Sequence, residues 1–93
     1  MPEMRFHVRW PDGTSEACYS PSLVVKEHLE PGGRYAIEDF VARSRTALTI
    51  GSERVRERYG FACSSALDQL ARIEAAATTQ PQDGLVSVER FEE

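Results

Sequence analysis

The stretch MRFHVRWPDGT, residues 4–14, decides the fold of this chain. Up to Trp10 its apolar residues alternate with charged or basic ones, which is the period of a strand that buries one face. The Pro-Asp-Gly that follows supplies turn residues, because proline presets φ and glycine accepts a positive φ. We expect a β-hairpin with a bulge at Gly13, in which Phe6 faces Cys18 and the Cys18 side chain points into the core.

The middle of the chain predicts helices. Ser20 before a proline is a helix-start signal, and a short helix over residues 21–29 follows from it. Two of the residues in 23–25 are β-branched, so an extended connection is the alternative there. Apolar residues at three- and four-residue steps predict a long helix over residues 37–59, in which Gly51 indicates a close crossing, a kink or a break.

A second helix and a late strand complete the predicted elements. We expect Gly60 to stop the long helix and Ser64 or Ser65 to cap the next one. Its inner side is predicted to carry Leu67, Leu70, Ala71 and Ile73 or Glu74. Residues 78–83 are predicted to be a loop, and residues 84–93 a last strand with a frayed tail.

These elements predict the α+β fold class. The N-terminal hairpin and the late strand form a small antiparallel sheet, and two to three helices pack on one face of it. We expect residues 1–93 to be a single domain with its core over about residues 4–77.

Composition narrows the class of protein. Of the 93 residues 41 % are hydrophobic and 28 % charged, as in ordinary globular domains. We expect no membrane partner, because no apolar run is long enough to span a bilayer. Without the pattern of a signal peptide the expected location is cytoplasmic. The net charge of -4 opposes nucleic-acid binding, and the small size of the domain favours self-association.

Few residues could carry chemistry. The spacing of Cys18, Cys63, His7 and His28 lacks the motifs of a metal site, so we expect no metal and no cofactor. Cys63 precedes a predicted helix, whose dipole favours the thiolate, and Ser64 beside it could help to bind an anion. The alternative is that Cys63 is a small buried residue. If both cysteines face one core, they form a redox-sensitive pair.

Four segments, residues 1–13, 18–22, 39–41 and 54–64, resemble a small bacterial family. They are similar to the "nitrogen starvation response" proteins of about this length, which are encoded in gene clusters beside a nitrilase, a radical SAM protein, an acetyltransferase and a flavoprotein. The resemblance runs to about Ala77. It implies a cytoplasmic accessory protein of nitrogen metabolism, and it brings no catalytic or ligand residue with it.

We therefore expect a non-catalytic accessory or regulatory protein. It would bind a partner enzyme or a small metabolite of the nitrilase-type gene cluster, and it would dock through its sheet or its long helix. The candidate binding residues are Arg5, His7, Arg9 and Tyr19. The alternatives are a solvated strand face without a partner, a small thiol-dependent enzyme or carrier that uses Cys63, and a winged-helix regulator, which the acidic charge opposes.

Overall fold

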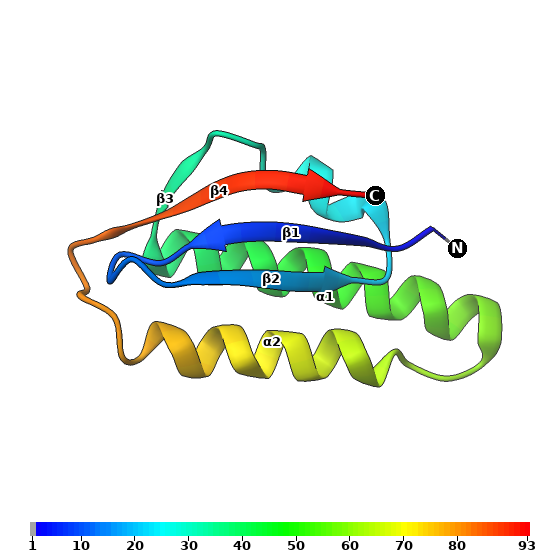
Figure 1. Cartoon of the computed structure of the whole chain (residues 1–93). Helices are drawn as coiled ribbons and strands as arrows, with labels where there is room; N and C mark the ends of the chain where they lie inside the picture. The colour runs from blue at the N-terminus through cyan, green and yellow to red at the C-terminus, as the bar shows by residue number, and fades with distance from the viewer. Residues whose placement is uncertain (1) are drawn as a thin grey trace.

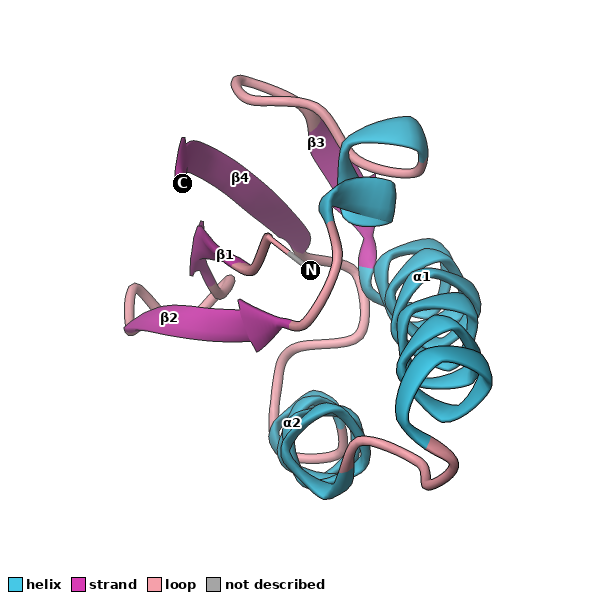
Figure 2. Ribbon diagram, turned by 90° about the vertical axis from the view of Figure 1, so that its right-hand side faces the viewer, coloured by secondary structure: helices cyan, strands magenta, loops and turns pink. Residues whose placement is uncertain are grey.

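A four-stranded antiparallel sheet and two α-helices make up residues 2–93, the part of the chain that the computed structural model describes (Figure 1). The strands are β1 (Met4–Arg9), β2 (Ser15–Ser20), β3 (Arg34–Ala36) and β4 (Leu85–Glu92), and the helices are α1 (Ile37–Tyr59), α2 (Ser64–Ala77) and the 3₁₀ helix η1 (Leu23–Glu27). The strand order is β2-β1-β4-β3. Figure 2 shows the sheet from its end with the helices on one side of it, so the predicted α+β class is confirmed.

The core lies between the sheet and the helices. Alternate residues of β1, β2 and β4 meet the inner faces of α1 and α2 there. Its largest fully buried side chains include Met4, Phe6, Phe40, Leu48 and Ile73. Successive side chains of a strand point to opposite sides of the sheet. The strand residues that alternate with the buried ones therefore point away from the helices and form an open face.

The hairpin forms as the sequence predicts. Phe6 pairs with Cys18, and the Cys18 side chain is fully buried. The Trp10 N–H donates to the Thr14 carbonyl at 2.8 Å, and Gly13 has a φ of +92°. A residue with a side chain is strained at that φ, so glycine fits the turn.

The last strand takes an interior position in the sheet. β4 pairs with β1 on one side and with β3 on the other, and it buries Val86 and Val88. It continues through Glu92, which pairs with Arg5. Glu92 therefore belongs to the strand, because the backbone of β1 extends far enough to pair with the end of β4.

The sequence did not predict β3. The chain reaches β3 through the Pro-Gly-Gly at 31–33, where the Gly32 N–H donates to the Val88 carbonyl at 2.8 Å, and it then runs along β4. Three residues show no readable alternation, so a strand as short as Arg34–Ala36 carries no sequence signal.

The segment after β2 begins differently from the prediction. In place of an α-helix over residues 21–29 it forms η1, and Ser22, not Ser20, caps it by accepting from the Val24 N–H at 3.3 Å. The Ser20 hydroxyl donates to the Ser22 carbonyl at 2.7 Å instead. The β-branched run limits this segment to a single tight turn.

α1 spans residues 37–59 without a break, and Gly51 marks a close crossing. A Cβ on Gly51 would lie 3.3 Å from Cγ of Pro21, so the chain before η1 approaches the helix there. The end of α1 extends beyond the sheet (Figure 1), where Tyr59 is 51 % exposed. Gly60 ends the helix with a φ of +85°, as predicted.

The start of α2 and the residues on its inner face differ from the prediction. Cys63 occupies the N-cap position and makes no capping hydrogen bond with its side chain, and Ser64 and Ser65 lie inside the first turn. Its buried residues are Ala66, Gln69 and Ile73. The prediction that Leu67 lies on the inner side is wrong, because its side chain is 47 % exposed.

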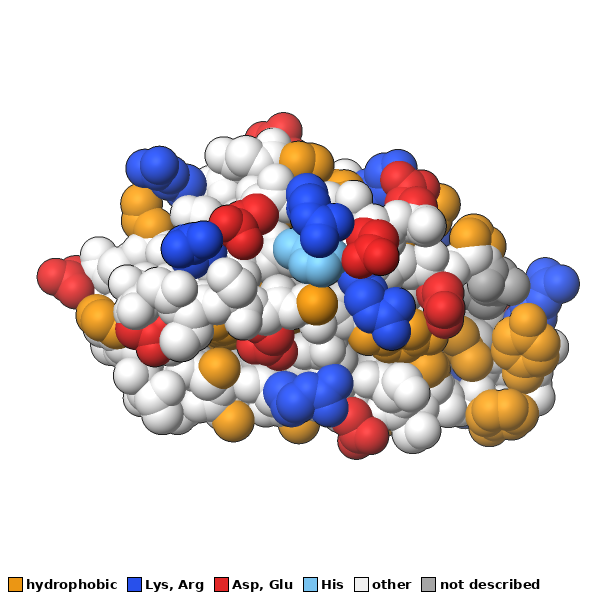
Figure 3. Space-filling model, viewed as in Figure 1, with side chains coloured by type: hydrophobic (Ala, Val, Ile, Leu, Met, Phe, Trp, Pro, Cys, Tyr) orange, Lys and Arg blue, Asp and Glu red, His pale blue; other side chains and the backbone are white. Residues whose placement is uncertain are grey.

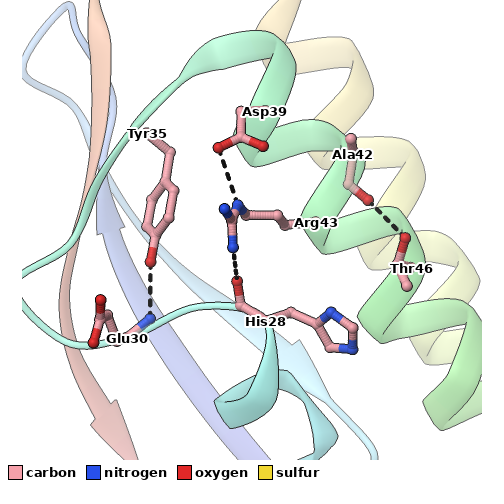
Figure 4. Close-up of polar contacts among 7 residues, drawn as sticks. All are labelled: His28, Glu30, Tyr35, Asp39, Ala42, Arg43 and Thr46. Atoms are coloured by element: carbon pink, nitrogen blue, oxygen red, sulfur yellow. Dashed lines mark hydrogen bonds and ion pairs between the residues drawn. The ribbon is translucent and has the colours of Figure 1, made fainter.

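A set of polar contacts holds the segment between η1 and β3 against α1 (Figure 4). The Arg43 guanidinium donates to Asp39 at 3.0 Å and to the His28 carbonyl at 2.9 Å, and it lies 5.0 Å from the Tyr35 ring. The Tyr35 hydroxyl accepts from the Glu30 N–H at 3.1 Å. These contacts fix the chain just before β3.

Candidate functional site

The side of the sheet away from the helices, here called the outer sheet face, is its open side. Its residues are those of the four strands whose side chains alternate with the buried ones, together with the bulge residue of β4. They are Arg5, His7, Arg9, Ser15, Ala17, Tyr19, Arg34, Ala36, Leu85, Ser87, Glu89, Arg90 and Glu92. All four predicted binding residues lie on this face, and Figure 3 shows charged side chains of both signs gathered over β1 and β4.

Ion pairs cross this face between β1 and β4. His7 Nε2 lies 2.8 Å from the Glu92 carboxylate, and Arg9 Nε lies 3.3 Å from that of Glu89. The hydrogen bond with His7 lowers the pKa of the Glu92 carboxyl. Such exposed pairs contribute little to stability, about 0–1 kcal/mol each, and exchange readily for other partners.

The charge of the outer sheet face is opposite to that of the whole chain. Four arginines lie on it against two glutamates. The full chain has a net charge of -4, so the rest of the molecule is strongly acidic. The face is thus a positive area on an acidic protein.

Tyr19 stands where the outer sheet face meets α2. Its hydroxyl donates to Glu3 at 3.1 Å and lies against the Cys63 thiol, and its N–H donates to Gln69 Oε1 at 3.0 Å. Partial burial, together with the hydrogen bond to Glu3, raises the pKa of Tyr19 to about 12. The hydroxyl therefore stays protonated at neutral pH and acts as a donor.

Cys63 lies half-buried at the start of α2. Its N–H donates to the Ser52 hydroxyl at 3.3 Å, and Ser64 is exposed beside it. Cys63 packs against the hydrophobic core, and the Tyr19 phenol near its thiol is protonated at neutral pH, so it cannot serve as a base for the thiol. A catalytic role for Cys63 and Ser64 stays a prediction.

Cys18 has a different environment. Its side chain is fully buried on the inner face of β2, and this burial raises the pKa of its thiol. Both cysteines are free thiols. The predicted redox pair of Cys18 and Cys63 stays a prediction.

A buried polar cluster under the edge of the sheet was not predicted. Gln69 is 1 % exposed, and its amide donates to Glu16 at 2.9 Å. Its oxygen accepts from Arg72 at 3.1 Å, and the Trp10 indole donates to Glu16 at 3.2 Å. A glutamine within a helix pattern gives no sign that it will be buried, because a strand edge far away in sequence supplies its partners.

Surface cavities open at both ends of α2. One of about 410 Å³ lies at the junction of β1, β2 and α2, and its lining residues are all polar: Glu3, Arg5, Tyr19, Ser65, Asp68 and Arg72. A wider groove of about 710 Å³ runs between the first turns of α1 and the end of α2, past Ile37, Val41 and Ala77. Only the first contains predicted binding residues, Arg5 and Tyr19.

A family model described as "Nitrogen starvation-induced protein NitG" matches residues 5–91. This chain belongs to that family. The match includes β4, whereas the resemblance seen in the sequence ended near Ala77. No curated protein and no solved structure matches the chain.

Membership of the NitG family relates this protein to nitrogen starvation and assigns no site to it. Within residues 2–93 of this NitG-family chain, no three His, Cys, Asp or Glu side chains gather into a group suited to a metal ion. Among the same residues no helix has the length and apolar character needed to cross a bilayer.

Proposed function

We propose that this protein is a non-catalytic accessory protein of bacterial nitrogen metabolism that binds a partner enzyme through its outer sheet face. Family membership supports the link to nitrogen starvation. The observation that supports docking is the excess of arginines on a face that no helix of residues 2–93 covers, on a chain of net charge -4. The partner surface we expect is acidic.

The chemistry of the face suits a protein surface. Arginine is enriched at interfaces because its planar guanidinium binds carboxylates with two hydrogen bonds. Arg90 has no carboxylate within ion-pair distance among residues 2–93. Arg9 forms an exposed ion pair with the carboxylate of Glu89. Both guanidiniums can therefore meet carboxylates of a partner without breaking a buried contact.

The partner we propose is a nitrilase, the enzyme that the resemblance described above implies to be encoded in the same gene cluster. The experiment is a binding titration of that enzyme with the wild-type protein and with the double variant Arg9→Glu and Arg90→Glu. We expect the double variant to lose at least about tenfold in affinity, and the loss to shrink at high salt.

Arg56→Glu is the matched control, because Arg56 is an exposed arginine of α1 whose partner is Glu53, 3.6 Å away. It should bind as the wild type does. Unchanged binding by the double variant, or no binding by the wild type, would count against the proposed docking.

We also propose that the protein self-associates and acts in the cytoplasm. A domain of 93 residues buries a smaller share of its unfolded-chain surface than a larger domain does, so burying further surface against a second copy adds stability. Light scattering across a concentration series measures the mass directly, and a monomer at every concentration would exclude self-association.

A further inference from the structure

We propose that the cavity between β1, β2 and α2 binds a small zwitterion, a free molecule of the amino-acid class with one carboxylate and one ammonium group. The cavity of about 410 Å³ lies within the range of small-molecule sites, about 300–1,000 Å³. The cavity shares Arg5 and Tyr19 with the outer sheet face, but the proposal does not depend on the docking of a partner enzyme.

The cavity contains cations that are free to bind a carboxylate. Arg5 and Arg72 both line it, and among residues 2–93 neither has a carboxylate within 4.0 Å, although Glu3 and Asp68 line the same cavity. Asp68 lies four residues before Arg72 on α2, a spacing that commonly gives an ion pair. Arg72 donates to Gln69 instead.

The guanidinium of Arg72 is held in place by the buried polar cluster. Gln69, its acceptor, is 1 % exposed and is itself fixed by the Tyr19 N–H at 3.0 Å and by Glu16 at 2.9 Å. An arginine oriented in this way loses less freedom when it binds a carboxylate. At the other side of the cavity Arg5 lies 5.9 Å from the Tyr19 ring, which orients it as well.

The same cavity contains the anion that an ammonium group requires. Asp68 makes no ion pair within 4.0 Å among the described residues, while the Glu3 carboxylate already accepts from the Tyr19 hydroxyl. The Ser65 hydroxyl adds a neutral donor and acceptor. A simple anion would leave the Asp68 carboxylate unpaired beside it, and an apolar ligand would bury the charged side chains of the cavity. A ligand that carries both a negative and a positive group therefore fits best. Figure 3 shows side chains of both charges over α2 and over the sheet above it.

The test is a titration of the ¹⁵N-labelled full chain, followed by NMR, with each of the common free amino acids. The best binder is then compared with its N-acetyl form, which lacks the ammonium group, and with its amide form, which lacks the carboxylate. We expect saturable shifts at Ser65, Asp68 and Arg72 with the free amino acid, and an affinity at least about tenfold lower for each blocked form.

Two exposed substitutions complete the test. Arg72→Gln and Asp68→Asn should each weaken binding by about tenfold or more, while Arg56→Gln, on α1, should leave it unchanged. Amide spectra of each variant show whether it is folded. The proposal is overturned if no free amino acid shifts these resonances, if the N-acetyl form binds as well as the free one, or if Asp68→Asn has no effect.

Discussion

At the scale of single residues, Tyr19 connects the features that matter for binding. Its backbone N–H holds Gln69 of α2, its ring lies beside Arg5, and its hydroxyl bonds to Glu3 and touches Cys63. One side chain thus joins the outer sheet face, the polar cavity and the half-buried thiol. Its ionisation is therefore a sensitive measure of this region.

Tyr19 should be slow to ionise as the pH rises. Its pKa in the folded protein is about 12, raised by burial and by Glu3, against about 10 for an unfolded tyrosine. The folded state then binds this proton more tightly, so the contribution to stability is complete below pH about 10 and is lost as the pH rises towards 12. A phenolate absorbance titration should show a component near 12 that Tyr19→Phe removes. A phenolate curve that is the same in Tyr19→Phe would contradict this assignment.

The two thiols should differ in reactivity. Cys18 is fully buried and its thiol pKa is raised, so both access and thiolate formation are suppressed. Cys63 is half-buried at a helix start. Iodoacetamide should therefore label Cys63 alone in the native protein and both cysteines after denaturation, as peptide mass spectrometry would show. Cys63→Ser is the control, and native labelling of Cys18 in it would contradict the burial of that side chain.

At the scale of elements, the sequence could predict those whose signals are local. The hairpin follows from alternation and a Pro-Asp-Gly turn, and α1 follows from a long periodic pattern with Gly60 at its end. The phase of α2 could not be predicted, because its inner face carries Gln69, whose burial depends on Glu16 and Tyr19 in β2. A pattern of apolar residues therefore placed Leu67 on the inner side.

The contacts of Arg43 should stabilise the chain before β3. Arg43→Ala removes a bond to the His28 carbonyl, the pair with Asp39 and the stacking on Tyr35, so we expect a loss of about 1–2 kcal/mol in the free energy of unfolding. Arg45→Ala is the control, because it removes only an exposed pair with Glu74 and should cost about 0–1 kcal/mol. Urea denaturation measures both, and equal losses would contradict a role for Arg43 beyond its charge.

Gly51 should tolerate only a small side chain. The crossing with Pro21 leaves 3.3 Å for a Cβ, so Gly51→Val forces further atoms into the contact and should cost about 1–3 kcal/mol. In Gly51→Ala the gain in helix propensity, up to about 1 kcal/mol, opposes the tight contact, and the net change should be near zero. Thermal denaturation compares the two variants. Equal stability of the valine variant and the wild type would show that the crossing is looser than the structure has it.

At the scale of the whole molecule, the candidate site comes from segments far apart in sequence. Local patterns could assign Arg5, His7, Arg9 and Tyr19 to one face of a hairpin. They could not show that β4 completes this face with Arg90 and Glu92, because its register depends on a bulge opposite His7 and Val8. The cavity lined by Arg5 and Arg72 depends on how α2 packs beside β2, which no local signal encodes.

The position of β4 makes the fold depend on the end of the chain. β4 is the last element in sequence, yet it lies between β1 and β3 and buries Val86 and Val88. A chain that stops at residue 84 loses these side chains, each contributing about 1.5–3 kcal/mol, and exposes an edge of β1. Small domains have only about 5–15 kcal/mol of stability, so we expect this truncation to abolish cooperative folding.

Removal of Glu93 alone is the matched control for that truncation. Glu93 lies beyond β4, where it pairs with the exposed Lys26 at 2.8 Å, so its loss should leave the fold intact. Circular dichroism on heating and the dispersion of amide resonances measure both chains. A truncated chain with a cooperative transition near that of the wild type would mean that β1, β2 and the helices fold without β4, and the outer sheet face would then require only the hairpin.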